Sequence, residues 1–329
     1  MKENEKPELS YEKKKRKRKK AISIAAPTVC ACIIFVVLLT QVILPMQKLN
    51  KAMEMIDAGE YDPAYAILEK LGDTEEIAKS KYARAMECID AQDYETALVL
   101  LNGLDYKDSE EKWESLKQNY YRVLFADAAV GDTIDFGAYE QDNDSSNGKE
   151  NIEWLVLAKR DNRLFVISRY ALDCQQYNTE YVDISWENCT LRKWLNDDFF
   201  NAAFSDWEKD MIPTITVSTD KNPDYTTNPG SVTQDKIFLL SITEANEYFK
   251  NDEDRICVPT AYAIANGAFT GGSYTKDDTA TCVWWLRSPG NVQKRAARVD
   301  SIGGVYSYGK NVRLVDVCVR PAMWIDLEA

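Results

Sequence analysis

The run AISIAAPTVCACIIFVVLLTQVILP, residues 21–45, contains no charged residue, and the nearest charges are Lys20 and Lys48. About 20 apolar residues in a helix span the hydrocarbon core of a bilayer, because each residue adds about 1.5 Å. The run therefore predicts a single transmembrane helix. The basic sequence KKKRKRKK, residues 13–20, precedes it, and basic residues beside a first span stay cytoplasmic. We expect residues 1–20 to form a cytoplasmic tail and the later residues to be extracellular.

Two alternatives assign the same run to export. A cleaved signal peptide has an apolar core of about 7–15 residues and a small-residue cleavage site, whereas this run continues through QVILPMQ. Val29-Cys30-Ala31-Cys32 is similar to a lipoprotein processing site, but the mature chain would then begin with IIFVVLL.

The basic run, residues 13–20, is also typical of a nucleic-acid patch. Its position beside the apolar run favours topology and contact with anionic lipid instead.

Charge is distributed unevenly along the 329 residues. Residues 1–20 hold ten basic and four acidic side chains, a net of +6, so the chain total of −13 leaves −19 for the remainder. This acidity argues against nucleic acid as a partner. It favours solubility outside the cell or a cationic partner.

The chain contains no histidine. The commonest general base, the usual zinc ligand and every Ser-His-Asp or Cys-His catalytic arrangement are therefore excluded. Five of the eight cysteines lie in the C-terminal part without any C-x-x-C spacing, so no metal or cofactor is predicted. They are expected to be buried, with one disulfide possible among them, and the pairing stays open: Cys174, Cys189, Cys257, Cys282 and Cys318.

Residues 46–130 have a helical pattern that repeats. The segment AMEMIDAGEYDPAYAILEKL, residues 52–71, matches AMECIDAQDYETALVLLNGL, residues 85–104, at a constant offset of 33. Asp62-Pro63, Asp73 with Glu76 and Asp108 with Glu111 are start signals for helices. The period resembles that of tetratricopeptide helical hairpins. Such an array implies a stalk or a partner-binding surface, and we expect its last helix to pack against the next domain.

Residues 131–329 change to a mixed pattern, which predicts an α+β domain. The segment IEWLVLAKRDNRLFVISRYAL contains two alternating apolar runs around Asp161-Asn162 and predicts a β-hairpin. CTLRKWLNDDFFNAAF, residues 189–204, returns to helical spacing. Strands are expected near the end of the chain, with a turn at Gly303-Gly304.

Three motifs in this region carry a family resemblance. They are residues 186–212, WENCTLRKWLNDDFFNAAFSDWEKDMI; residues 284–290, WWLRSPG; and residues 319–325, VRPAMWI. In this order they resemble a widespread bacterial extracellular domain family of unknown function, although Cys318 stands where that pattern has glycine. The last two motifs are also loosely similar to the C-type lectin-like fold in its formylglycine-generating-enzyme variant. The resemblance implies structural roles for Trp194, Trp284, Arg320 and Trp324.

Ligand-binding candidates follow from residue type. They are Trp285, Arg287, Tyr306, Tyr308, Asn311 and Arg313. Neighbouring residues in a strand point to opposite faces, so one of Trp284 and Trp285 should face the core and the other be available to a ligand, although buried packing is favoured for each. Each arginine of the motifs is either a clamp for an anion or a buried partner of an acid such as Asp300 or Asp316. Trp194-Leu195-Asn196-Asp197 lacks the spacing of a lectin calcium motif, so no metal is predicted there.

These observations favour a membrane-anchored, single-pass extracellular binding protein that displays an α+β domain on a helical-repeat stalk. Its ligand would be a protein, a peptide or an envelope glycan. The alternatives are a cell-envelope enzyme with a carboxylate- or cysteine-based site and a purely structural spacer. Paired carboxylates such as Asp197 and Asp198 are typical of a solvated helix face rather than of a glycosidase.

Overall fold

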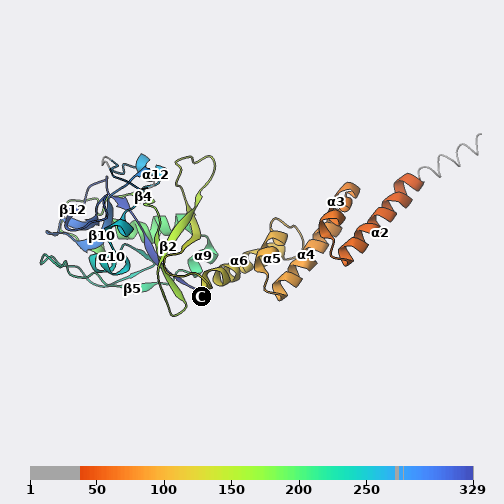
Figure 1. The fold of residues 1–329 in the computed structure, drawn as a ribbon, viewed down its shortest axis with the longest axis horizontal. Helices are drawn as coiled ribbons and strands as arrows, with labels where there is room; N and C mark the ends of the chain where they lie inside the picture. The colour runs from red at the N-terminus through yellow and green to blue at the C-terminus, as the bar shows by residue number, and fades with distance from the viewer. Residues whose placement is uncertain (1–37, 271–273, 277, 329) are drawn as a thin grey trace, which may run out of the picture. The chain divides into compact units, whose positions relative to one another are not determined.

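The computed structural model describes residues 38–270, 274–276 and 278–328. The chain divides into two compact units, with the boundary between Trp113 and Glu114. The first unit is helical, and the second combines helices with two five-stranded sheets. The α+β character that the sequence predicts is therefore confirmed (Figure 1).

The expected transmembrane helix is not supported, and the predicted fold class and membrane assignment are wrong on this point. No helix within the described residues is long and apolar enough to cross a bilayer. The described end of the predicted span enters a π-helical turn, Leu39–Ile43, and then α2, Leu44–Asp57. This helix leaves the apolar run after Pro45 and continues through Lys48, so its composition is mixed. Residues 1–37, which include most of the span, the basic tail, Cys30 and Cys32, lie outside the described residues.

Four further helices follow α2: α3 (Tyr61–Leu71), α4 (Thr74–Asp90), α5 (Tyr94–Leu101) and α6 (Ser109–Ala126). The Asp73 carboxylate accepts a hydrogen bond from the N–H of Glu76, which confirms the predicted cap of α4. The helix α3 begins at Tyr61, so Asp62 lies in its first turn rather than at its N-cap. Gly72 ends α3 in the left-handed region with φ +73°, as is usual for a helix C-cap.

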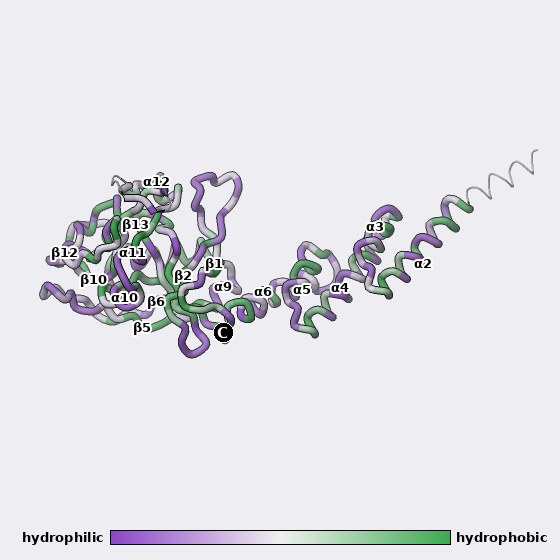
Figure 2. The backbone as a smooth tube through the Cα atoms, in the orientation of Figure 1, coloured by the Kyte–Doolittle hydropathy of each residue, from purple (hydrophilic) through white to green (hydrophobic). Residues whose placement is uncertain are grey.

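The repeated sequence corresponds to a repeated structure. Helix α2 contacts α3, and α4 contacts α5. Equivalent small and large apolar side chains are fully buried in both pairs: Ala52, Ala64 and Leu68 in the first, and Ala85, Ala97 and Leu101 in the second. Small side chains allow the two helices of a pair to approach closely. Figure 2 shows hydrophilic and hydrophobic residues alternating along these helices. Membership of the tetratricopeptide class stays a prediction.

The first sheet of the α+β unit has the strand order β1-β2-β3-β14-β7. Its strands are β1 (Thr133–Tyr139), β2 (Glu150–Arg160), β3 (Arg163–Ser168), β14 (Ala322–Asp326) and β7 (Ile237–Phe238). All neighbours are antiparallel. The predicted turn between β2 and β3 is present, and both Asp161 and Asn162 have positive φ, as a tight hairpin turn requires.

The second sheet has the order β12-β11-β10-β13-β4. Its strands are β12 (Val305–Asn311), β11 (Arg295–Val299), β10 (Trp284–Pro289), β13 (Cys318–Val319) and β4 (Asp173–Cys174). The WWLRSPG motif forms β10, which lies in the middle of this sheet and pairs in parallel with β13. The strand β12 is at one edge.

Short elements connect the two sheets. The helices are α7 (Thr190–Trp194), α8 (Phe200–Ala203), α9 (Asp206–Asp210), α10 (Ile242–Tyr248), α11 (Asp252–Arg255) and α12 (Ala261–Ala265), with a 3-10 turn at Trp186–Asn188 and a π-helical turn at Leu195–Phe199. Two small pairs are β5 (Ile215–Val217) with β6 (Thr233–Asp235), and β8 (Thr275–Lys276) with β9 (Thr279–Ala280).

One hydrophobic core serves the α+β unit and includes both sheets. The part of α6 that belongs to this unit contributes Tyr121 and Phe125. The Tyr121 ring stacks on Trp207 at 4.9 Å, and Phe125 meets Phe136 edge to face at 5.8 Å. The prediction that the last helix of the array packs against the following domain is therefore confirmed.

Candidate functional site

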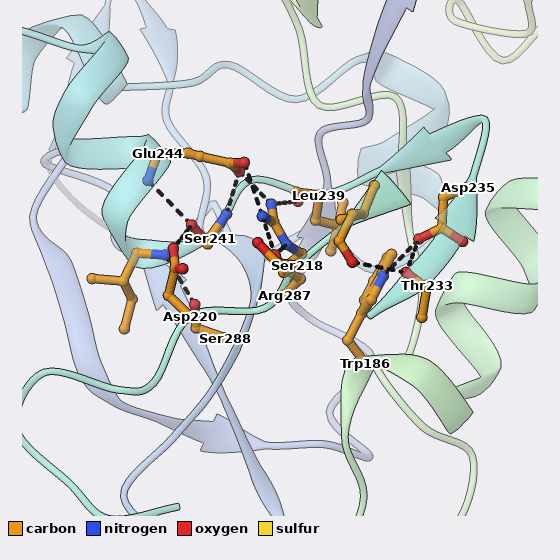
Figure 3. Close-up of polar contacts among 12 residues, drawn as sticks. Trp186, Ser218, Asp220, Thr233, Asp235, Leu239, Ser241, Glu244, Arg287 and Ser288 are labelled. Carbon is orange, nitrogen blue, oxygen red and sulfur yellow. Dashed lines mark hydrogen bonds and ion pairs between the residues drawn. The ribbon is translucent and has the colours of Figure 1, made fainter. Parts of the chain in front are cut away.

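The arginine of the WWLRSPG motif lies at the centre of a buried polar network (Figure 3). The Arg287 guanidinium forms a two-point ion pair with the Glu244 carboxylate, and its Nη2–Oε1 distance is 2.8 Å. It also donates to the carbonyl oxygens of Leu239 and Ser218. The Ser288 hydroxyl accepts a hydrogen bond from the N–H of Ile242. Every guanidinium nitrogen thus has a partner inside the protein.

Both tryptophans of the motif are buried rather than one of them. The indole N–H of Trp284 donates to the Arg255 carbonyl at 3.1 Å, and that of Trp285 donates to the Gln175 carbonyl at 3.0 Å. The expectation that one side chain is available to a ligand is wrong, because β10 is an interior strand with protein on both faces. The structure places Trp285 and Arg287 in the core, apart from the other four candidates.

The remaining motif residues also pack internally. Arg320 is buried between Trp284 and Phe249, with its guanidinium 5.2 and 5.3 Å from the two ring centres. Trp324 stacks on Phe165 at 5.0 Å, and Trp194 packs near Phe199 at 5.5 Å. These contacts agree with structural roles. Neither Asp300 nor Asp316 is the partner of Arg287, whose acid is Glu244.

Two of the predicted binding residues lie together on an exposed surface. Tyr306 and Tyr308 in β12 are 45% and 50% exposed. The Arg298 guanidinium lies 4.6 Å from the Tyr306 ring centre, and the Arg295 guanidinium lies 4.5 Å from that of Tyr308. Tyr225, from a loop, meets Tyr308 edge to face at 6.2 Å. We call Tyr225, Arg295, Arg298, Tyr306 and Tyr308 the tyrosine–arginine face.

A bulge in the β11–β12 hairpin produces this face. Arg298 pairs with Tyr306, and Ala296 pairs with Lys310, so three residues of β12 oppose one of β11. Gly309 in the bulge has φ +74°, and a Cβ there would overlap the carbonyl of Ala296. The bulge changes the alternation of side chains. Arg295 and Arg298, three residues apart in β11, both lie against exposed tyrosines of β12.

A loop supports the face from the side of β12. The buried Asn222 amide donates to the carbonyls of Pro289 and Ser307 at 2.7 and 2.8 Å. The Ser307 hydroxyl donates to Asp224, which is the residue before Tyr225. These bonds fix Tyr225 beside Tyr308.

The face is basic within an acidic protein. Residues 291–313 contain five basic side chains and one acidic side chain, Asp300. Burial lowers the pKa of Arg298, and its Nε has no hydrogen-bond partner. Within the part of the chain that the structure describes, neither Arg295 nor Arg298 forms an ion pair. The two guanidinium groups thus lie against rings rather than in ion pairs, while Asp300 and Asp316 act on Arg298 at longer range.

The last two candidates follow the face along the chain. Asn311 pairs with Arg295 across the hairpin, and its side-chain oxygen accepts the N–H of Arg313 at 2.9 Å. The Arg313 carbonyl accepts a bond from Gln176, while the Arg313 side chain is exposed. These contacts shape the turn after β12.

Another group of side chains has oxygen atoms close enough for one cation: Glu140, Asp142 and Glu150. Partial desolvation, and then repulsion by Glu150, raises the pKa of Glu140. The Glu150 carboxylate accepts the N–H of Gln141 at 2.6 Å, and Asp142 accepts the Asn147 amide at 2.7 Å. These acids already organise their own loop.

A cleft of about 360 Å³ contains the mixture of charges that an enzyme would need, including Asp135, Lys149 and Glu208. Two of these three side chains already form hydrogen bonds with backbone groups of the protein. Glu208 accepts the N–H of Gly137 at 3.0 Å and that of Ser205 at 2.7 Å, and Lys149 donates to the Ala202 carbonyl at 2.6 Å. In this cleft Glu208 and Lys149 therefore make structural contacts with the backbone.

Comparison with protein families gives one match. The profile of a family described as "Domain of unknown function (DUF6273)" matches residues 161–327, which is half of the chain. The matched segment includes the Arg287 network and the tyrosine–arginine face. The expected likeness to a domain family of unknown function is confirmed at this level, and the lectin-like similarity stays a prediction. No curated protein and no solved structure matches the chain.

Proposed function

The chain belongs to the family of the DUF6273 domain, and on the geometry of that domain we propose that the protein binds a ligand through the tyrosine–arginine face. The supporting observation is that two guanidinium groups lie against exposed tyrosine rings and form no ion pair with any residue that the structure describes. Tyrosine and arginine are the residues that most often dominate binding energy at interfaces.

The positive charge of the tyrosine–arginine face indicates a ligand that carries negative charge. Arginine presents a planar fork of donors that matches a carboxylate, and the stacked rings hold that fork in place before the ligand arrives. Prior positioning lowers the entropy lost on binding. The ligand is therefore an acidic segment of a protein or peptide, whose carboxylates meet Arg295 and Arg298 while its apolar parts contact Tyr306 and Tyr308.

A binding role fits the described chemistry better than an enzymatic one. Burial raises the pKa of the Cys189 thiol to about 12 and that of Cys257 and Cys282 well above the usual value. Rapid nucleophilic catalysis uses a cysteine whose pKa is lowered and whose thiol is open to solvent, so these thiols are suited at most to slow exchange. The helical unit keeps its predicted role as a stalk or second partner surface.

The test is binding of the full chain to an array of acidic peptides, each printed beside a copy with Gln and Asn in place of Glu and Asp. We expect tighter binding to the acidic copies and weaker binding as salt increases. Replacing Tyr306 and Tyr308 together with Ala should reduce affinity at least tenfold, and replacing Arg295 and Arg298 should remove the preference for acids.

Tyr181→Ala is the matched control, because Tyr181 is 50% exposed, lies beside Lys294 and is not part of the face. It should leave affinity unchanged. Equal binding to acidic and amide peptides, or full affinity in the double tyrosine variant, would contradict the proposal. Binding to uronic-acid oligosaccharides instead of peptides would assign the face to a glycan.

A further inference from the structure

Four cysteines from separate parts of the sequence meet inside the α+β unit. Cys174 lies in β4, Cys318 in β13, and Cys257 and Cys282 face each other in an isolated antiparallel bridge. All four are buried. The Sγ atoms of Cys174 and Cys318 are 2.9 Å apart although the residues are 144 positions apart in the sequence.

The backbone around Cys174 and Cys318 suits a covalent bond. The two residues are direct partners in neighbouring antiparallel strands. Neither N–H bonds to the other residue, because that of Cys174 donates to Asp173 Oδ1 at 2.7 Å and that of Cys318 to the Val283 carbonyl at 2.8 Å. Pairs of this kind have Cα atoms about 4.5 Å apart. A disulfide requires about 4.4–6.8 Å.

The other two thiols extend the contact into a chain. Cys318 interacts with Cys282, and Cys282 interacts with Cys257. The Cys257 Sγ also lies 3.7 Å from the carbonyl oxygens of Arg169 and Val258, so its thiol is directed toward backbone acceptors. Cys282 is therefore the neighbour best placed to react with a disulfide at Cys318.

A positive charge lies close to this chain. Arg320 weakens the rise in pKa that burial gives to the Cys257 and Cys282 thiols. Its Nε donates to the Ser168 carbonyl at 2.8 Å, while its buried Nη1 has no hydrogen-bond partner. Its charge offsets part of the cost of burying a thiolate at Cys257 or Cys282, although the pKa of both thiols and of Cys318 stays well above the ordinary value.

We propose that Cys174 and Cys318 form a dithiol site that is oxidised to an intramolecular disulfide by a low-molecular-weight disulfide, with Cys282 as a third thiol in contact with the pair. Cys174 is 6% exposed and Cys318 is fully covered, so Cys174 meets the reagent first. Its thiolate attacks one sulfur of the reagent, forms a mixed disulfide and releases one thiolate.

The Cys318 thiolate then attacks the Cys174 sulfur and releases the second reagent thiol. Two protein thiols and one reagent disulfide thus become one protein disulfide and two reagent thiols, so electrons and protons balance. Attack by Cys282 on Cys318 would move the bond deeper into the core and free Cys174 again.

The experiment treats the reduced full chain with glutathione disulfide, blocks free thiols after acid denaturation and maps the unreduced peptides by mass spectrometry. We expect a cross-linked Cys174–Cys318 peptide whose mass is lower by two hydrogens. The rate should rise with pH, because the thiolate is the attacking species. In Cys318→Ser, Cys174 should accumulate the mixed glutathione adduct.

Cys189→Ser is the matched control, since Cys189 is buried but contacts Tyr177 and the N–H of Arg192 instead of the thiol chain. It should form the same cross-link as the unchanged protein. The cross-link formed by the unchanged protein tests the proposal by itself, so the test does not depend on the folding of either variant. Absence of any cross-link, or a Cys257–Cys282 cross-link in its place, would overturn the assignment.

Discussion

The guanidinium of Arg287 is held on two nitrogens by the carboxylate of Glu244, which precedes it by 43 residues. This pair ties α10 to the central strand of the second sheet. Replacing Arg287 with Met leaves Glu244 and the carbonyls of Leu239 and Ser218 without their donor. Because the Glu244 side chain is 24% exposed, we expect a loss of about 2–4 kcal/mol, below the range for a fully enclosed pair. Urea unfolding followed by tryptophan fluorescence measures it.

Arg160→Met is the matched control for this prediction. Arg160 pairs with Glu247 at 3.7 Å, but both side chains are more than half exposed. A change below about 1 kcal/mol is expected there. Equal effects of the two substitutions would show that the buried pair has no special role.

Gly309→Ala should destabilise the β11–β12 hairpin by more than about 2 kcal/mol. The added Cβ meets the Ala296 carbonyl in a backbone conformation with φ +74°, which L residues rarely adopt. Gly148→Ala isolates the conformational part, since Gly148 has φ +101° and open space around it. That control should lose about 1 kcal/mol. A comparable loss of stability in both variants would contradict the close approach of β11 and β12 at Gly309.

Cys189 should make stability fall at alkaline pH under reducing conditions. Burial raises the pKa of its thiol from an ordinary 9.0 to about 12. The folded protein therefore keeps a proton that the unfolded chain loses, so the stabilisation is complete below pH 9 and is lost as pH rises toward 12. One such thiol contributes about 1.4 kcal/mol of loss by pH 10.

The measurement compares urea unfolding of Cys189→Ala and the unchanged protein at pH 8 and pH 10. The variant should lose about 1 kcal/mol less between the two pH values. Cys88→Ala, in the helical unit, is the comparison: burial also raises the pKa of that partly exposed thiol, so the difference from the unchanged protein should have the same sign but be smaller. An identical pH dependence in Cys189→Ala would contradict the argument.

Asp93→Ala should destabilise the helical unit by about 1 kcal/mol, because its carboxylate accepts the N–H of Thr96 at the start of α5. Glu60 has nearly the same backbone conformation at the start of α3 but forms no such bond. The third residue of α3 is Pro63, which has no N–H to donate. Glu60→Ala should therefore have almost no effect. Thermal unfolding followed by circular dichroism distinguishes the two, and equal effects would refute the capping argument.

Local features of the fold were accessible from sequence. The hairpin turn at Asp161-Asn162, the cap at Asp73 and the repeat of Ala52 at Ala85 each depend on residues close together or on a constant period. The predicted transmembrane helix relied on hydropathy alone. Hydropathy gives the length of an apolar run. It does not give the residues at which a helix begins and ends.

Contacts between distant segments were not accessible. Glu244 was missed as the partner of Arg287 because no local pattern links two residues 43 positions apart. Tyr306 and Tyr308 were found by their residue type. Arg295 and Arg298 were missed since, in a regular strand, side chains three apart point to opposite faces. The register shift beside Gly309 breaks this regular pattern, and both arginines lie against tyrosines.

The strand β14 lies between β3 and β7 in the first sheet, and this position has a consequence for biosynthesis. Until residue 326 has emerged from the ribosome, the edges of β3 and β7 that pair with β14 are exposed. Such edges are templates for pairing with other chains. The α+β unit thus completes its folding after translation of this segment, and in the interval a chaperone that shields strand edges would protect the nascent chain from aggregation.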